Sequence, residues 1–263
     1  MQSNIGSKAA GLTMSAPAAA TLIRQVAQTS PVAAAELERL CNGVSEASGG
    51  MPIGRIRSGQ LFSSGGMTVL AANTTAVQTT TLFAVGVNNA NASLAGGRVM
   101  TFADTNMVTG GALRNSAFLA TGFGLRMSLD TDAATRGADF YDLLQPTLAW
   151  ISENTSVSLQ IGAQDVQRLG SLEDWPSGGT RIGNQFASGA NAAINTIGLI
   201  GDAPYGPGSV FDFNLAIPAE TTIRVDCKLE RASTVPVGGA IPNDTVIKIK
   251  GTFYGFEITA LQG

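Results

Sequence analysis

The stretch FDFNLAIPAETTIRVDCKL, residues 211–229, contains two alternations of apolar and polar residues separated by a turn-forming PAE at 218–220. On each side of the turn every second residue is apolar, and Arg224, Asp226 and Lys228 fall between the apolar residues of the second run. Side chains of a strand alternate between its two faces, so this pattern predicts strands with one buried and one solvated face. Such strands are typical of antiparallel sheets.

Short alternations of apolar and polar residues, separated by turn-forming residues, continue in both directions from this stretch. We expect strands at 61–62 and 67–70 (a hairpin around Ser64-Gly65-Gly66), 80–87, 98–102, 117–129, 155–161, 210–217 and 221–229. Within these segments the residues expected to face inward include Phe83, Phe123, Leu125, Val157 and Leu159. Crossover helices between the strands are missing, which disfavours a parallel α/β sheet and predicts an all-β sandwich or jelly roll.

The last expected strand, 245–261, changes the parity of its apolar residues. One set lies before the change and the other after it: Ile247, Ile249, Phe253, then Tyr254, Phe256, Ile258. We predict a β-bulge at Gly251-Thr252, which would let a curved strand keep both sets facing inward.

Helices are expected mainly before residue 50. Residues 1–16 are small and polar and predict a flexible arm, and a short helix is expected at 18–28. A second helix has Ser30 as its N-cap, Pro31 at its first position, and Asn42-Gly43 as its stop. Its apolar stripe consists of Ala33, Leu37, Leu40 and Val44. Packing on its own domain and packing on a neighbouring subunit are equally open for this helix. A single helical segment is also expected at 139–145.

The composition is poor in charge: 13% of the residues are charged and 44% are hydrophobic, where about 25% charged is average. A soluble monomer normally keeps a more charged exterior, so we expect much of the surface to pack against copies of the chain; the alternative is a surface rich in Thr, Ser and Asn that stays soluble without charge. The net charge of −3 provides no strong field for nucleic acid or anionic lipid. Neither a signal peptide nor an apolar run long enough to span a membrane is visible, so we expect folding in the cytoplasm.

Candidate catalytic groups are few because the chain has no histidine. This excludes Ser-His-Asp and Cys-His sites and histidine-containing metal sites. Glu173-Asp174 beside Trp175 could imitate a sugar-binding cluster, but the following PSGG indicates a structural turn. The acidic residues from Asp130 to Asp142 lack EF-hand spacing, and 198–208 (GLIGDAPYGPG) lacks the Lys-Ser/Thr of a phosphate loop. We therefore predict a non-enzyme without catalytic, cofactor-binding or metal-binding residues, and without cofactors.

The order of these elements resembles the major capsid proteins of tailless icosahedral bacteriophages with internal membranes, such as the corticoviruses. The segments that carry the resemblance cover about two-thirds of the chain as an order of elements: 102–129 (FADTNMVTGGALRNSAFLATGFGLRMSL), 138–145 (ADFYDLLQ), 157–170 (VSLQIGAQDVQRLG), 175–179 (WPSGG) and 211–229. The resemblance implies two jelly rolls side by side, with an arm and two short helices at 1–53, a first jelly roll at 54–137 and a second at 138–263. Because the chain is short for two such domains, a single elaborated jelly roll stays open.

The function that the resemblance implies is that of a structural subunit of an icosahedral bacteriophage capsid, self-assembling through trimeric capsomers. Its partners would be further copies and other capsid proteins, with an internal membrane or the genome reached through the N-terminal arm. The chain would be made in the host cytoplasm and reside in the virion. Two alternatives stay open. One is a carbohydrate-binding or adhesin-type jelly-roll module, using the aromatic residues Trp150, Trp175 and Tyr205. The other is a hydrolase that uses only carboxylates.

Overall fold

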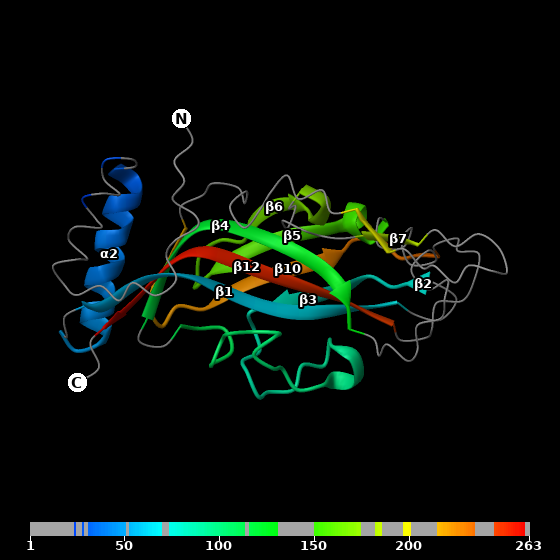
Figure 1. The fold of residues 1–263 in the computed structure, drawn as a ribbon, viewed down its shortest axis with the longest axis horizontal. Coiled ribbons are helices and arrows are strands. Elements are labelled where there is room, and N and C mark those ends of the chain that lie inside the picture. Colours follow the sequence, from blue (N-terminus) through cyan, green and yellow to red (C-terminus); the bar gives the residue numbers. More distant parts are fainter. Residues whose placement is uncertain are drawn as a thin grey trace.

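The computed structural model describes residues 31–50, 53–69, 74–113, 116–130, 150–174, 182–185, 197–200, 215–234 and 245–260, together with Arg24 and Gln28. Over these ranges the chain is mostly β, with two four-stranded antiparallel sheets packed as a sandwich and an N-terminal helix, α2 (Pro31–Ala47), beside it (Figure 1); residues 150–154 are also helical. Within this part of the chain, no helix is long and apolar enough to cross a membrane. The expected arm at 1–16 and the expected helices at 18–28 and 139–145 lie largely or wholly outside the described residues.

Each sheet combines strands that are far apart in the sequence. The first sheet has the order β1 (Ile53–Val69), β12 (Thr245–Ala260), β4 (Ser116–Leu129), β9 (Leu215–Ile217). The second has the order β3 (Gln78–Leu82), β10 (Ile223–Leu229), β5 (Thr155–Ile161), β6 (Gln167–Ser171). Smaller elements are the pairs β2 (Thr74–Thr75) with β11 (Ser233–Thr234) and β7 (Ile182–Gln185) with β8 (Ile197–Ile200), and the 3-10 turns η2 (Ala95–Gly97) and η4 (Leu172–Asp174). Strands on both sides of residue 138 therefore share each sheet.

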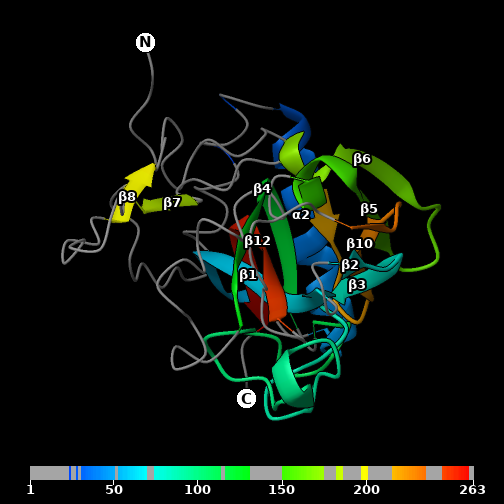
Figure 2. The same cartoon turned by 90° about the vertical axis from the view of Figure 1, so that its right-hand side faces the viewer.

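The main core lies between the two sheets, which Figure 2 shows edge-on with β1, β12 and β4 on one side and β3, β10 and β5 on the other. Three aromatic rings form its centre: the Phe253 ring centroid lies 4.5 Å from that of Phe123 and 5.3 Å from that of Phe83. The inward faces of β5 and β10 are confirmed, since every second residue of each strand is buried. Burying each large apolar side chain contributes about 1.5–3 kcal/mol, so this layer dominates the stability of the sandwich.

A second core lies on the outer face of the first sheet, under α2 at the left of Figure 1. Leu37, Leu40 and Val44 of the helix are buried there against Leu119 of β4 and Ile258 of β12. The helix therefore packs on its own domain. It continues through Asn42-Gly43, where we expected it to stop, and ends at Ala47, because Val44 still has an apolar surface to cover.

These two cores explain the change of parity in β12. Ile247, Ile249 and Phe253 face the sandwich core, whereas Phe256 and Ile258 face α2 on the opposite side of the sheet. The predicted bulge at Gly251-Thr252 is wrong, since β12 keeps an unbroken register with β1 from Thr245 to Thr259. Instead, the register with β4 shifts between Tyr254 and Gly255, leaving Thr121 of β4 as the extra residue.

The predicted hairpin around Ser64-Gly65-Gly66 is also wrong, because these residues lie within the continuous strand β1. The two glycines allow neighbouring segments to pack closely against β1. A Cβ on Gly66 would meet the backbone oxygen of Ser93 and the side chain of Val246, and a Cβ on Gly65 would meet Thr80. The lack of a side chain lets another segment cross this strand at contact distance.

Two other predicted strands are shorter than expected or absent. Strand β3 ends at Leu82, because Phe83 adopts φ 69° and turns the chain out of the sheet. Residues 98–102 form no strand, and only Val99 makes an isolated bridge with Ala90. The segment predicted at 117–129 is confirmed as β4, and that at 210–217 is described only over 215–217.

Candidate functional site

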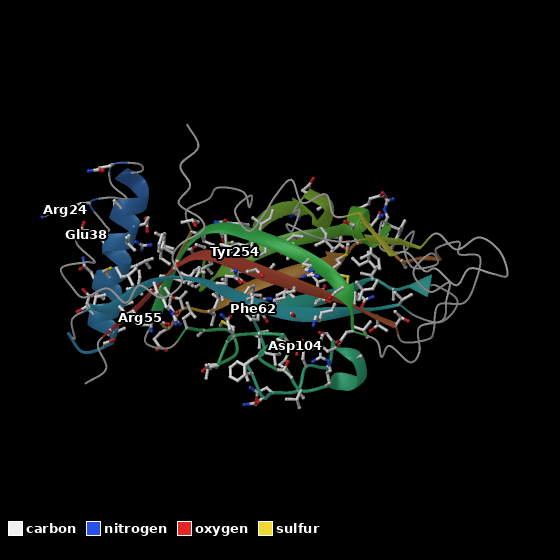
Figure 3. The ribbon with its side chains drawn as sticks, viewed as in Figure 1. Arg24, Glu38, Arg55, Phe62, Asp104 and Tyr254 are labelled. Atoms are coloured by element: carbon white, nitrogen blue, oxygen red, sulfur yellow. The ribbon has the colours of Figure 1, made fainter. Side chains whose placement is uncertain are left out.

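The segment 83–113, called the crossing loop here, runs from β3 in the second sheet toward β4 in the first and covers edge strand β1 (Figure 1, below the sheets). The Ser64 hydroxyl of β1 donates a hydrogen bond to the carbonyl of Asp104, 2.9 Å away. The amide of Asn91 donates to the Ser64 carbonyl. Figure 3 places Phe62 on β1 and Asp104 on the loop beside it. The loop thereby closes one side of the sandwich.

A buried ion network fixes this loop. Arg98 donates to both carboxylate oxygens of Asp104 (Nη1 to Oδ2 2.7 Å, Nη2 to Oδ1 2.9 Å) and to Asp130 at the end of β4 (Nη2 to Oδ1 2.6 Å). Lys248 Nζ of β12 lies 3.0 Å from Asp104 Oδ1, and the Thr101 hydroxyl donates to Oδ2 at 2.8 Å. The Asp104 side chain is only 2% exposed and that of Asp130 only 9%. Two cations, 33% and 19% exposed, thus balance two buried carboxylates.

The electrostatic consequence is large for Asp104. The hydrogen bonds from Arg98 hold the pKa of the Asp104 carboxyl well below its usual range, against the opposing effect of burial, and Thr101 and Lys248 lower it further. The two carboxylates raise the pKa of Arg98 still higher. These shifts keep Arg98 and Asp104 charged near neutral pH. Because every polar group is used in holding the loop, the network has the character of a structural clamp.

Side-chain amides occupy the outer edge of β1. Asn106 accepts from the backbone N–H of Phe62 at 2.8 Å and donates to the carbonyl of Gln60 at 2.6 Å. Gln78 does the same for Thr68, at 2.9 Å in both directions. Each amide therefore imitates the pairing of a neighbouring strand.

Two hydroxyls complete this edge at Gly66. The Ser93 hydroxyl accepts from the Gly66 N–H at 3.0 Å, and the Thr80 hydroxyl donates to the Gly66 carbonyl. An exposed strand edge is a template for pairing with another chain, and native proteins commonly block it. Between Gln60 and Thr68 the edge of β1 is blocked in this way.

The crossing loop carries exposed apolar side chains above the ion network. Val99, Phe102 and Val108 are 51%, 70% and 80% exposed. Beside them, Lys250 Nζ lies 3.7 Å from the Phe62 ring centroid and donates to the Ala103 carbonyl at 3.2 Å. Burial lowers the pKa of Lys250. The crossing loop therefore exposes apolar side chains on a backbone that the ion network fixes.

Two of the cavities at the surface of the sandwich are lined by described residues. The larger, about 570 Å³, is lined by Arg55, Arg57, Leu61, Leu113, Phe118 and Glu257, among others. The smaller, about 490 Å³, lies beside β10 and is lined by Thr81, Gln160, Gly162, Thr222 and Arg224, among others. Arg224 in the smaller cavity is paired with Asp226, which also accepts from the Thr81 hydroxyl. The charge of Arg224 is thus already balanced.

The groups that the sequence suggested for chemistry do not converge among the described residues. Asp174 lies in η4 and accepts from the backbone N–H and the hydroxyl of Ser171, both at 2.8 Å, as a structural turn requires. These two hydrogen bonds lower its pKa. Asp130 belongs to the ion network, and Trp150 is half-buried against the core. Trp175, Tyr205 and the acidic residues Asp132, Asp139 and Asp142 lie outside the described ranges.

Comparisons with known proteins leave the chain without an assigned family. No protein-family model, no curated protein and no solved structure matches it. Within the described ranges, no three His, Cys, Asp or Glu side chains gather in a group that could hold a metal ion. The residues that sequence reasoning missed are Arg98, Asp104 and Lys248. Their pairing joins positions far apart in the chain, and a single sequence carries no periodic signal for it.

Proposed function

We propose that this chain is a structural subunit of an icosahedral bacteriophage capsid, residing in the virion and assembling through trimeric capsomers. The observation that carries the proposal is the nested pairing of the strands. Among the strands of the two four-stranded sheets, the first in sequence pairs with the last: β1 with β12. Moving inward along the chain, β3 pairs with β10, β4 with β9, and β5 with β6.

Nested antiparallel pairs describe one long two-stranded ribbon that is folded over on itself. Rolling that ribbon so that alternate pairs fall in opposite sheets gives the orders β1-β12-β4-β9 and β3-β10-β5-β6. A jelly roll has this arrangement, with two Greek keys in a double sheet, and viral capsid domains commonly use it. We therefore propose one jelly roll over 53–260. Two jelly rolls side by side receive no support from sheets that combine strands of both halves.

The surface of the crossing loop supports an assembly role. Large apolar side chains exposed together on a fixed loop are typical of protein–protein contacts. Val99, Phe102 and Val108 are exposed apolar side chains of the crossing loop, and the ion network holds the loop backbone at Arg98 and Asp104. The low charge content of the chain, 13%, suits a surface that is covered in the assembled state. We propose that this loop forms part of the contact between copies.

Light scattering coupled to size-exclusion chromatography, followed by negative-stain electron microscopy, tests this function. We expect the purified chain to form trimers or closed particles as its concentration rises. Phe102→Ser should shift the population toward the monomer, whereas the matched control Val166→Ser, 56% exposed between β5 and β6, should not. A wild-type chain that stays monomeric at every concentration up to saturation would contradict the proposal.

A further inference from the structure

The larger cavity lies at the end of the sandwich nearest α2, where β1 begins. Figure 3 places Arg55 there, close to the helix. The cavity volume of about 570 Å³ lies within the range of roughly 300–1,000 Å³ that is typical of small-molecule sites. Sites of this kind combine an apolar lining with a few polar groups that fix the orientation of the ligand.

The apolar part of this lining comes from both strands and loop. Leu61 and Phe118 are buried members of the main core, and Leu113 packs against that core. Val108, 80% exposed, stands at the edge of the cavity. An apolar chain that entered here would cover mainly Val108 and Leu113 and gain the free energy of that burial, because Leu61 and Phe118 are already only 4% and 2% exposed.

The charged part of the lining has an excess of one positive charge. Arg57 is paired with Glu257, with Nε donating to Oε2 at 2.6 Å, so these two charges balance. Arg55 has no carboxylate partner in the part of the chain that the structure describes. Its Nε is buried without a hydrogen bond, while the side chain as a whole is partly exposed and lines the cavity. A buried donor without a partner is rare in folded proteins, but a ligand in the cavity would have to pair with the accessible part of the Arg55 side chain, since this Nε is itself buried.

From this arrangement we propose that the cavity binds a carboxylate carried on a short apolar chain, with Arg55 as its ion-pair partner. A guanidinium binds a carboxylate through two parallel hydrogen bonds, which a compact ammonium cannot reproduce. The apolar chain would lie along Leu113 and Val108, above the buried Leu61 and Phe118. This inference does not depend on the capsid proposal, because it concerns only the groups that line the cavity.

Two sources could supply such a carboxylate: a free aliphatic acid, or an acidic side chain of a second copy. In the first arm of the test, octanoate is titrated into the full chain and binding is monitored by the amide chemical shifts in NMR spectra. We expect shifts at Val108 and Leu113, and none at Thr222 beside the smaller cavity. Octanol, which has the same chain without the charge, should bind more weakly. Arg55→Gln should weaken octanoate binding by about 10- to 100-fold, the range for losing a hydrogen bond to a charged group.

Matched variants keep the test decisive. Arg39→Gln removes an exposed arginine of α2, outside the cavity, and should leave octanoate affinity unchanged. Arg55→Lys keeps the charge and should bind octanoate with intermediate affinity, which provides a second measurement if Arg55→Gln folds poorly. Octanoate binding no tighter than octanol, or equal affinity in the wild type and the Arg55 variants, would overturn the proposal.

The second arm separates the two sources by light scattering with and without octanoate. If octanoate saturates the chain and leaves its association state unchanged, the free acid is the ligand. If octanoate dissociates an oligomer, and Arg55→Gln dissociates it as well, the carboxylate comes from a second copy. A wild-type chain that is monomeric but still binds octanoate through Arg55 would contradict the capsid proposal and leave the cavity proposal standing.

Discussion

Replacing Asp104 by Asn should destabilise the fold far more than removing a surface charge. The substitution keeps the size of the side chain but removes the charge that accepts from Arg98, Lys248 and Thr101. Breaking a buried ion pair by removing one partner costs about 3–5 kcal/mol. Arg98 retains Asp130 and its side chain is 33% exposed, so we expect the lower end, about 3 kcal/mol. For a domain of this size, that corresponds to a fall in Tm of roughly 6–12 °C.

The assay is urea unfolding followed by circular dichroism at pH 7, with Glu36→Gln as the matched control. The Arg39–Glu36 pair has side chains 63% and 35% exposed, and such exposed helical pairs contribute only about 0.3–0.5 kcal/mol. If Asp104→Asn lowers the free energy of unfolding no more than Glu36→Gln does, the clamp role of the network is refuted.

The loss of stability caused by Asp104→Asn should depend on pH. The pKa of Asp104 is lowered in the folded state, so its contribution to stability is fully present above the unfolded pKa of about 3.9 and is lost as the pH falls toward the folded pKa. The difference in unfolding free energy between wild type and Asp104→Asn should therefore be constant from pH 8 to about pH 5 and shrink below about pH 4. A difference that grows on acidification would contradict the assigned direction of the pKa shift.

Three further predictions concern packing and reactivity. Gly66→Ala should cost about 1–3 kcal/mol or more in urea unfolding, because the added methyl meets the crossing loop, whereas Gly59→Ala, with nothing within 4 Å, should stay within about 0.5 kcal/mol. Leu37 of α2 is fully buried against the first sheet, so Leu37→Ala should lower the free energy of unfolding by about 2–5 kcal/mol; a smaller loss would show that the helix does not pack on the sheet. Burial raises the pKa of Cys41 to about 11 and that of Cys227 to about 12, so neither thiol should react with Ellman's reagent at pH 8 until urea unfolds the chain. Rapid reaction of either thiol in the native protein would show that its site opens.

The sequence predicted which residues of a strand share a face, but it predicted less well which part of the fold covers each face. The buried faces of β5 and β10 follow directly from a period of two, because each of these strands has only one apolar neighbour layer. In β12 the same rule failed. Phe253 and Ile258 have opposite parity because the second sheet covers one and α2 covers the other. A single sequence shows where the apolar residues of a strand change face. It does not show that a second apolar layer, here α2, covers the other face of the sheet.

Glycine and charge misled sequence reasoning for a related reason. Gly65-Gly66 suggested a turn, but the glycines lie in a continuous strand where the crossing loop approaches too closely for a side chain. Arg98, Asp104 and Lys248 gave no signal at all, because their partnership depends on a loop crossing a sheet. Long-range contacts of this kind are set by topology, and local propensity does not encode them.

The blocked edge of β1 and the clamped loop together constrain how copies of this chain could meet. The outer backbone groups of Gln60, Phe62, Gly66 and Thr68 in β1 are paired with side chains of Asn106, Gln78, Ser93 and Thr80. Another chain could not add a strand there without displacing these side chains. Contact at this side would have to use side chains on the loop surface. A loop already fixed by buried ion pairs loses little conformational entropy when it is covered, so more of the burial of Phe102 and its neighbours would remain as association free energy. If copies meet through this loop, loosening the clamp should therefore weaken their association by making the loop surface more mobile before it is covered.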